Sequence, residues 1–257
     1  MTAVRWVDTH CHLTMLDEPA GRVLDRAATV GVGWVMCPGI DADSSNAARA
    51  VAGAEPGRVL WSAGLHPHDA DRWPAEADRI VALAADAAAV GECGLDHYRE
   101  LSPRDVQRVA FEAQVGLAVE LDKPVIVHCR DAFAAVFEVL EGAGLGSRAV
   151  LHSWTGGRRW TKRFRELGAT FSFSGIVTYP TAHTLREAVS EVDPATAMVE
   201  TDTPYLTPEP NRTDRNEPAN VVAVGTELAA LWGIDVGEVA RLTTARAVSV
   251  FGAPDGG

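Results

Sequence analysis

The chain has 257 residues, of which 47% are hydrophobic, and a formal net charge of −12. This is enough apolar material for one large α/β barrel or for two smaller domains. The acidic balance argues against a protein that coats duplex DNA through a broad basic surface, but it permits a nucleic-acid substrate at a local metal centre, where the ions supply the positive charge.

Short apolar runs, often β-branched, alternate with longer helical patterns along the chain. Strands are predicted at residues 5–9, 33–37, 59–64, 88–91, 124–127, 148–151, 169–174 and 196–200. Helices are predicted near residues 18–31, 41–54, 74–87, 102–121, 133–140, 158–167, 181–191, 218–232 and 235–251. Residues 205–220, rich in Pro, Asn and Arg, are expected to form a long irregular loop, and residues 252–257 a frayed tail.

Eight strands that alternate with helices at this spacing predict a single-domain (β/α)8 TIM barrel over residues 1–257. The sequence contains no internal repeat, linker or low-complexity segment. An open doubly wound sheet is the alternative fold. It is disfavoured because no G-x-G-x-x-G or Walker loop follows an early strand.

The four cysteines lie at positions 11, 37, 93 and 129, with no C-x-x-C pair and no framework spacing. Scattered thiols of this kind favour a reducing compartment, so we expect a cytoplasmic protein. The N-terminus has no secretory signal pattern, and no run of about 18 apolar residues suggests a membrane span.

Side chains that can bind metals follow six of the predicted strands. His10 and His12 alternate with Cys11 in extended backbone, so both imidazoles face one side. The other strand ends carry His66, Glu92, His128, His152 and Asp202. In a barrel, all of these ends ring one mouth. Five of the eight histidines lie there beside two carboxylates, which predicts a metal centre rather than separate hydrogen-bonded polar residues.

The number of candidate ligands indicates two metal ions. Six groups are too many for one catalytic ion that keeps an open position: His10, His12, Glu92, His128, His152 and Asp202. Glu92 comes from the middle strand of the set and is the expected bridge between the ions. Two divalent ions (Mg, Mn or Zn) would lower the pKa of a bound water, so the centre predicts a hydrolase.

Several short motifs together resemble the TatD family of metal-dependent deoxyribonucleases, which belongs to the amidohydrolase-type barrels. The motifs are HxH at 10–12, GLHPH at 64–68, GECGLD at 91–96, VHCR at 127–130, HSWTG at 152–156 and ETDTPYL at 200–206. The segment NRTDRNEP at 211–218 resembles a family loop that borders the site. The resemblance covers essentially the whole chain. It implies a (β/α)8 fold, two divalent ions and phosphodiester hydrolysis, usually as a 3′→5′ exonuclease on DNA.

Carried over by position, the resemblance also implies a ligand set for each ion. His10, His12, Glu92 and Asp202 would surround one ion, and Glu92, His128 and His152 would surround the other. The chain departs from common family residues at Cys93, His97 and Asp214. These departures concern the substrate preference and leave the proposed ligands intact.

Asp202, Glu92 and His66 are the predicted catalytic residues. Asp202 is the candidate general base, because a ligand at a strand end can also accept a proton from the attacking water; a purely structural ligand is the alternative. His66 is needed in neither ligand set. We expect it to donate a hydrogen bond to the phosphate or the leaving oxygen, or else to be structural.

Other residues near the mouth are candidates for substrate binding. Arg130 would reach a phosphate, or else pair with an acid such as Asp131. Tyr205 and Trp154 would stack on an unpaired base or pack at the rim. The basic residues between 158 and 165 form either a solvated helix face or a phosphate-binding patch.

Three functions are consistent with this pattern. The first is a metal-dependent deoxyribonuclease acting on single-stranded DNA or frayed ends, with a monomer favoured. The second is a hydrolase of a carbonyl substrate, such as a lactone, an amide or an aminoacyl-tRNA ester, because the same ions would polarise a carbonyl. The third is a metal-stabilised binding protein without catalytic activity.

Overall fold

The computed structural model describes residues 6–254 of the chain. Arg5, the first residue of the first predicted strand, and residues 255–257 of the predicted tail lie outside this range. The strands are β1 Trp6–Asp8, β2 Val32–Cys37, β3 Val59–Ala63, β4 Ala89–Asp96, β5 Val125–Arg130, β6 Ala149–Leu151, β7 Thr170–Phe173 and β8 Ala197–Val199. All eight strands lie close to their predicted positions.

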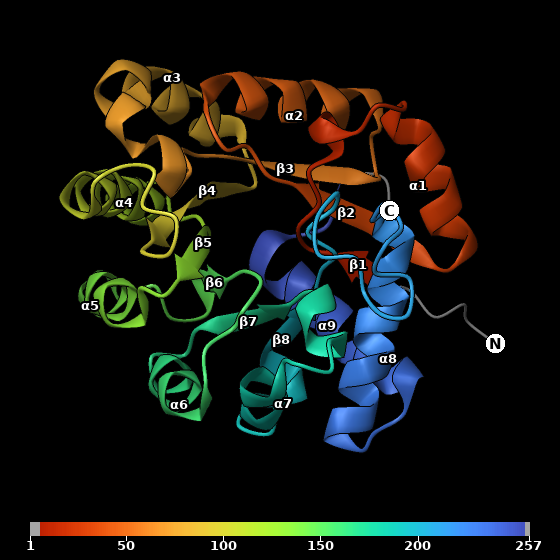
Figure 1. Cartoon of the computed structure of the whole chain (residues 1–257). Coiled ribbons are helices and arrows are strands. Elements are labelled where there is room, and N and C mark those ends of the chain that lie inside the picture. The colour runs from red at the N-terminus through yellow and green to blue at the C-terminus, as the bar shows by residue number, and fades with distance from the viewer. Residues whose placement is uncertain (1–5, 255–257) are drawn as a thin grey trace.

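The strands form one parallel sheet in the order β1 to β8, so each strand pairs with its neighbours in the chain. Backbone contacts then join the last strand to the first. The amide of Thr9 donates to the carbonyl of Val199 at 3.0 Å, and Cys11 forms a parallel bridge with Thr203. The sheet curves round on itself (Figure 1), which confirms the predicted TIM barrel. The open doubly wound alternative is wrong, because such a sheet changes its strand order at a switch point.

Helices surround the strands on the outside of the barrel (Figure 1). They are α1 Ala20–Thr29, α2 Ala42–Ala54, α3 Trp73–Asp86, α4 Arg104–Glu120, α5 Phe133–Ala143, α6 Arg158–Glu166, α7 His183–Val189, α8 Val221–Trp232 and α9 Val236–Phe251. Short 3-10 helices lie in several loops, including η1 Leu13–Met15, η2 Pro67–Arg72, η4 Gly175–Thr178, η5 Pro194–Thr196 and η6 Pro218–Asn220. The predicted helices are therefore present, with ends that differ by a few residues.

The last helix, α9, closes the amino-terminal end of the barrel. Ala247 and Phe251 of α9 form an apolar cluster with strand residues that include Val7, Ile126 and Met198. The same helix contacts η5, which lies just before β8. Burial of these side chains removes apolar surface from water and fills this end of the barrel. The opposite end, where the strands finish, is left for the predicted site.

Within residues 6–254, no single helix is long and apolar enough to cross a bilayer. The segments Pro218–Trp232 and Val236–Phe251 meet that criterion only as a pair, and they are bent by 110° at the break between them. Both α8 and α9 contact β1 and β8 of the barrel.

Two strands extend further than the sequence predicts. The strand β4 continues to Asp96, and β5 continues to Arg130, so Glu92 and His128 lie within strands. Glycine normally weakens a strand, and this segment contains Gly91 and Gly94. Gly94 instead pairs with His128 at a φ of 144°, and a Cβ there would lie 2.0 Å from the His128 carbonyl oxygen. Glycine is required at this position because the two strands approach so closely.

Candidate metal centre

Glu92 lies at the centre of the predicted cluster, and its two carboxylate oxygens face different groups. Its Oε2 atom lies 3.2 Å from Nε2 of His10 and 3.7 Å from Nε2 of His12. Asp202 completes this group, since its Oδ1 atom lies 3.8 Å and 3.5 Å from the same two nitrogens. The four residues predicted around one ion therefore lie together at the mouth.

The other oxygen of Glu92 faces a second group of imidazoles. Its Oε1 atom lies 3.1 Å from Nδ1 of His128, 3.1 Å from Nε2 of His152 and 3.4 Å from Nε2 of His66. His128 and His152 are the residues predicted around the second ion. A carboxylate placed between two sets of imidazoles has the arrangement expected of a bridging ligand.

The donor set fits divalent cations. Nε2 of His10 and Nε2 of His12 face each other at 3.2 Å, within the spacing of about 3.0–3.4 Å for two nitrogens that bind one ion at about 2.1 Å. Burial alone would raise the pKa of Glu92, but the neighbouring His152, His66 and His10 hold it well below its usual value. An anionic carboxylate surrounded by imidazoles is the ligand chemistry that Zn, Mn and Mg share to different degrees.

Two further carboxylates, not singled out from the sequence, contact the far sides of the histidines. Asp96 Oδ2 lies 3.2 Å from Nε2 of His128, and Glu200 Oε1 lies 3.0 Å from Nδ1 of His152. Both carboxylates are fully buried. Partners of this kind orient a ligating imidazole and fix its tautomer. Asp96 lies in the motif GECGLD and Glu200 in the motif ETDTPYL, so these family motifs could have identified both residues.

Asp96 accepts hydrogen bonds on both oxygens. Its Oδ2 atom also lies 2.9 Å from Nε2 of His68, and its Oδ1 atom accepts from the amides of Tyr98 and Arg99 at 3.0 and 2.8 Å. Burial opposes ionisation, but the hydrogen bonds from His128, Arg99 and His68 hold the pKa of Asp96 far below its usual value. Asp96 is thus an anion that can accept hydrogen bonds but cannot donate them.

His66 lies beside Glu92, and its tautomer is suited to donating a hydrogen bond. The amide of His68 donates to Nδ1 of His66 at 3.2 Å, so the hydrogen of a neutral ring is on Nε2, which faces Glu92. Burial lowers the pKa of His66 to about 4, which keeps the ring neutral near pH 7. His66, Glu92 and His128 are also close enough to share a cation. The Nε2–H tautomer favours the hydrogen-bond donor predicted from the sequence.

Asp202 is held at the seam between β8 and β1. Its amide donates to the carbonyl of His10 at 2.8 Å, and the amide of His12 donates to the carbonyl of Thr203 at 2.8 Å. The φ of Asp202 is 59°, a left-handed conformation that aspartate adopts more readily than most residues. Ligands that are about 190 positions apart in the sequence are fixed in this way by backbone hydrogen bonds.

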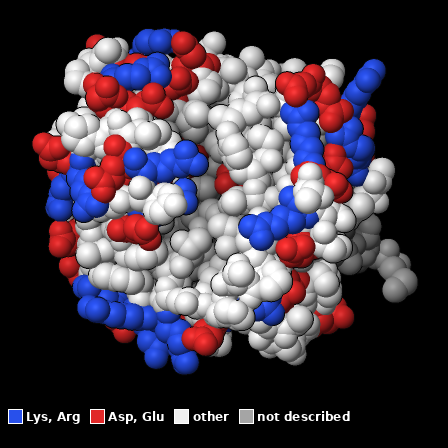
Figure 2. Space-filling model, viewed as in Figure 1, with Lys and Arg blue, Asp and Glu red and all other residues white. Residues whose placement is uncertain are grey.

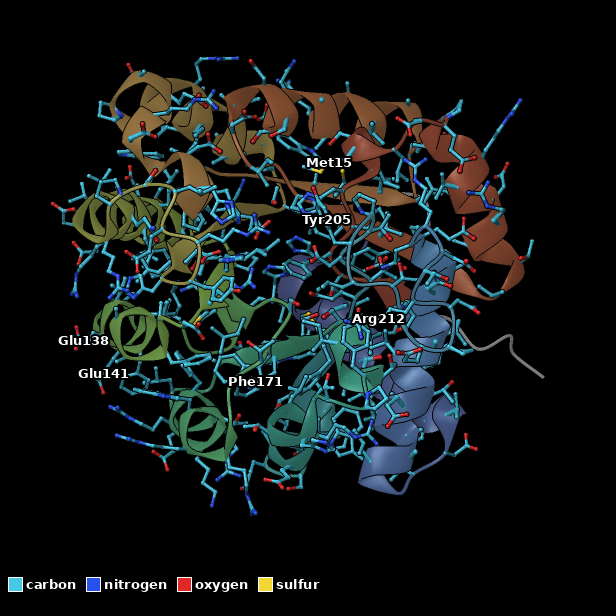
Figure 3. All side chains as sticks on the ribbon, viewed as in Figure 1. Met15, Glu138, Glu141, Phe171, Tyr205 and Arg212 are labelled. Carbon is cyan, nitrogen blue, oxygen red and sulfur yellow. The ribbon has the colours of Figure 1, made fainter. Side chains whose placement is uncertain are left out.

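The cluster forms the floor of a pocket of about 630 Å³ at the carboxyl ends of the strands. Figure 2 shows this hollow in the centre of the face, with basic side chains on both sides. Tyr205 lines the pocket and is 54% exposed, and its hydroxyl donates to Met15 Sδ at 3.7 Å. Both side chains lie at the mouth in Figure 3. This places Tyr205 where a base could stack on it.

Arg130 also lines the pocket. Its guanidinium lies over the ring of Tyr98, with Cζ 4.1 Å from the ring centroid. Among residues 6–254 it forms no ion pair, so the alternative pairing with Asp131 is wrong. Arg130 is free to bind an anion at the mouth.

Two other expectations for the mouth differ from the structure. Trp154 is only 2% exposed, and its indole donates to Thr161 at 2.9 Å, so it packs in the core and cannot stack on a base. The basic residues lie on the outer helix α6, where Glu191 pairs with Arg158, Lys162 and Arg165. Glu191 neutralises much of the patch, which favours a solvated helix face over a phosphate-binding surface.

Three cysteines lie next to ligands in the sequence. Cys11, Cys93 and Cys129 are buried in the large apolar cluster formed by strands and helices. All of them are free thiols. Their surroundings are those of small apolar side chains, not of metal ligands.

Known proteins resemble this chain over nearly its full length. The uncharacterized metal-dependent hydrolase YcfH of Escherichia coli K12 is 36% identical over 252 residues, with 95% of each chain covered. The 3′-5′ ssDNA/RNA exonuclease TatD of Rahnella sp. strain Y9602 is 33% identical over 249 residues, covering 93% of this chain and 94% of that protein. The crystal structure of YJJV, a TatD homologue from E. coli K12, has a TM-score of 0.88 at 26% identity and covers 98% of this chain and 100% of its own.

The sequence profile described as TatD related DNase matches residues 7–252. The matched region contains every residue of the centre described above, from His10 to Asp202. The chain therefore belongs to the TatD-related DNase family of metal-dependent hydrolases.

Proposed function

We propose that this protein hydrolyses phosphodiester bonds of single-stranded nucleic acid, DNA in particular, as a 3′→5′ exonuclease. The observation that carries the proposal is Glu92, whose two oxygens face separate groups of imidazoles at the floor of an open pocket. The Rahnella relative, named a 3′-5′ ssDNA/RNA exonuclease, supports the substrate and the polarity. It also favours this function over a carbonyl hydrolase or a non-catalytic binding protein.

The proposed cofactor is a pair of divalent cations, Mg, Mn or Zn. One would be held by His10, His12, Glu92 and Asp202, and the other by Glu92, His128 and His152. When bound, such ions polarise a phosphoryl oxygen and lower the pKa of water.

The side chains then have separate tasks. Asp202 is the general base: interactions with His12, His152 and His10 outweigh burial and hold its pKa below the usual value, so its carboxylate accepts the proton of the attacking water. His66 donates from Nε2–H to an oxygen of the phosphate or of the leaving group. Arg130 offers its N–H groups to a phosphate, and Tyr205 offers its exposed ring to a base.

We also propose that residues 1–257 form one barrel domain that works as a monomer in the cytoplasm. The four buried, unbridged cysteines support a reducing compartment.

The test is digestion of a 20-nucleotide single-stranded DNA labelled at either end, with Mg, Mn or Zn added in turn. We expect a ladder that shortens from the 3′ end, is abolished by EDTA and is lost in Glu92→Gln. The control Arg159→Gln, on the outer helix α6, should cut like the wild type. Turnover of ester or lactone substrates without any cleavage of DNA or RNA would contradict the proposal.

A further inference from the structure

Two arginines on the face that carries the pocket lie beside aromatic rings: Arg130, which lines the pocket, and Arg212, in the loop after β8. Cζ of Arg130, at the end of β5, lies 4.1 Å from the ring centroid of Tyr98. Cζ of Arg212, in the loop after β8, lies 4.0 Å from the ring centroid of Tyr179. Figure 2 shows basic side chains on two sides of the hollow, and Figure 3 places Arg212 on the side away from α4 and α5.

Both arginines lack a carboxylate partner, although acidic residues outnumber basic ones by 35 to 23. Most arginines in the described part of the chain form ion pairs, such as Arg26 with Glu18 and Arg108 with Glu112. Arg130 and Arg212 form none within residues 6–254. An unpaired cation at a pocket in so acidic a protein is suited to an anionic ligand.

The stacked geometry prepares each guanidinium for a phosphate. Each guanidinium lies with Cζ 4.0–4.1 Å from a ring centroid, which limits its motion, and it carries five N–H donors. Those donors match two phosphate oxygens at once, which a lysine ammonium cannot do. Tyr98 is 64% exposed, whereas Tyr179 is buried and its hydroxyl donates to the carbonyl of Thr207 at 3.1 Å. Arg212 therefore rests on the more rigid ring.

The two pairs lie toward opposite halves of the metal centre. Arg130 is two residues beyond His128, which faces Oε1 of Glu92. The hydroxyl of Tyr179 donates to the carbonyl of Thr207, five residues after Asp202 in the loop that follows β8. Asp202 belongs to the group that faces Oε2 of Glu92. A strand whose scissile phosphate lies over Glu92 would thus meet one arginine on each side.

We propose that Arg130 and Arg212 bind the phosphates on either side of the scissile phosphate, and that the enzyme consequently prefers a strand whose 3′ end carries a phosphate. A 3′-hydroxyl end has no phosphate beyond the scissile bond, so it would leave one arginine unused. This inference rests on the proposed function. The reaction is unchanged: water adds to the scissile phosphorus, and the leaving oxygen takes up a proton.

The test compares three substrates in the metal-loaded enzyme: an octanucleotide ending in a 3′-phosphate, the same strand ending in a 3′-hydroxyl, and bis(p-nitrophenyl) phosphate. We expect the wild type to show about tenfold higher kcat/KM for the 3′-phosphate strand than for the 3′-hydroxyl strand. Of the variants Arg130→Ala and Arg212→Ala, one should lose this preference. In the other variant, kcat/KM for the octanucleotide divided by kcat/KM for bis(p-nitrophenyl) phosphate should fall by about tenfold or more.

Arg163→Ala is the matched control. Arg163 also lies on an aromatic ring, with Cζ 3.8 Å from the Phe137 centroid, but it is on the outer helix α6. Both substrate ratios should be unchanged in this variant. The slope of log(kcat/KM) against log[salt] for the octanucleotide should fall by about 0.7 in each mouth variant and stay constant in the control. Circular dichroism checks that all the variants fold.

Equal rates on the two strands in the wild type, or equal losses in Arg163→Ala and the mouth variants, would overturn the inference. If the wild type cleaves none of the three substrates, the proposed function fails on its own. The arginines are then tested by anisotropy with a labelled phosphorothioate octanucleotide ending in a 3′-phosphate. Weaker binding in Arg130→Ala and Arg212→Ala than in Arg163→Ala supports phosphate binding at the mouth, and equal binding rejects it.

Discussion

Asp96 Oδ2 lies 3.2 Å from Nε2 of His128, while Glu92 Oε1 lies 3.1 Å from Nδ1 of the same ring. The imidazole of His128 thus lies between two carboxylates. Because the Asp96 anion can only accept hydrogen bonds, Nε2 keeps its hydrogen, and Nδ1 on the Glu92 side is the atom whose lone pair would bind a cation. Asp96 fixes the tautomer that a ligand requires and acts as a positioning residue.

Replacing Asp96 should therefore weaken metal binding without removing a ligand. We expect Asp96→Ala to lower the affinity for one of two Mn or Zn ions by about 10–100-fold, and Asp96→Asn to lower it less, because an amide oxygen still accepts. Isothermal titration calorimetry on metal-free protein measures both. The surface variant Asp122→Asn is the control. An unchanged affinity in Asp96→Ala would show that His128 needs no such partner.

Removal of the metals should lower thermal stability. Each ion that binds only the folded chain, present at about 100 times its Kd, stabilises the chain by about 2.7 kcal/mol, which is about 5–10 °C in Tm for a chain of this size. Differential scanning calorimetry with and without EDTA measures the shift. In Glu92→Gln, which loses the shared anion, the response to EDTA should be much smaller. A Tm that EDTA does not change in the wild type would mean that no ion is bound to the folded state.

The buried thiols should be dispensable for metal binding. Burial raises the pKa of Cys11, Cys93 and Cys129, so these groups are thiols rather than thiolates near pH 7. Replacing all three by alanine should leave two metals per chain in plasma emission analysis. The free energy of unfolding should drop by about 0.5–2 kcal/mol for each lost sulfur. Loss of one metal in the triple variant would identify a thiol as a ligand.

Gly94→Ala should disturb β5 at the site. The new Cβ would meet the His128 carbonyl, and the φ of 144° is unfavourable for alanine. We expect a loss of about 2–5 kcal/mol in unfolding free energy, together with lower metal occupancy. Urea denaturation and metal analysis report the two effects. The control is Gly53→Ala in α2, where a Cβ has open space and should change stability by less than about 1 kcal/mol.

The regular spacing of apolar residues along the sequence made the fold and most residues of the metal centre predictable. His10 and His12 could be placed on one face because strand side chains alternate, and Glu92 and Asp202 because they follow short apolar runs. The contacts across the barrel could not be predicted in this way. Asp96 reaches a histidine 32 positions away, and Glu200 reaches one 48 positions away.

Two errors have local physical causes. The predicted end of β4 was wrong because a glycine, which usually ends a strand, here allows the close approach of β5. Trp154 follows a ligand by two residues, so its sequence position suggested the mouth. Ser153 between them has a φ of 42°, which turns the chain away from extended geometry and directs the indole into the core.

The position of Asp202 at the seam has a consequence for synthesis of the chain. Its ligand group joins the first strand to the last through the amide of Asp202 and the carbonyl of His10. A nascent chain that ends before residue 202 has only part of this group, so a cation arriving early finds no complete cage. Once the segment that contains Asp202 has emerged, a cation bound by this ligand group would hold the first and last strands of the barrel together. Release of that cation would then be the first step in opening the barrel.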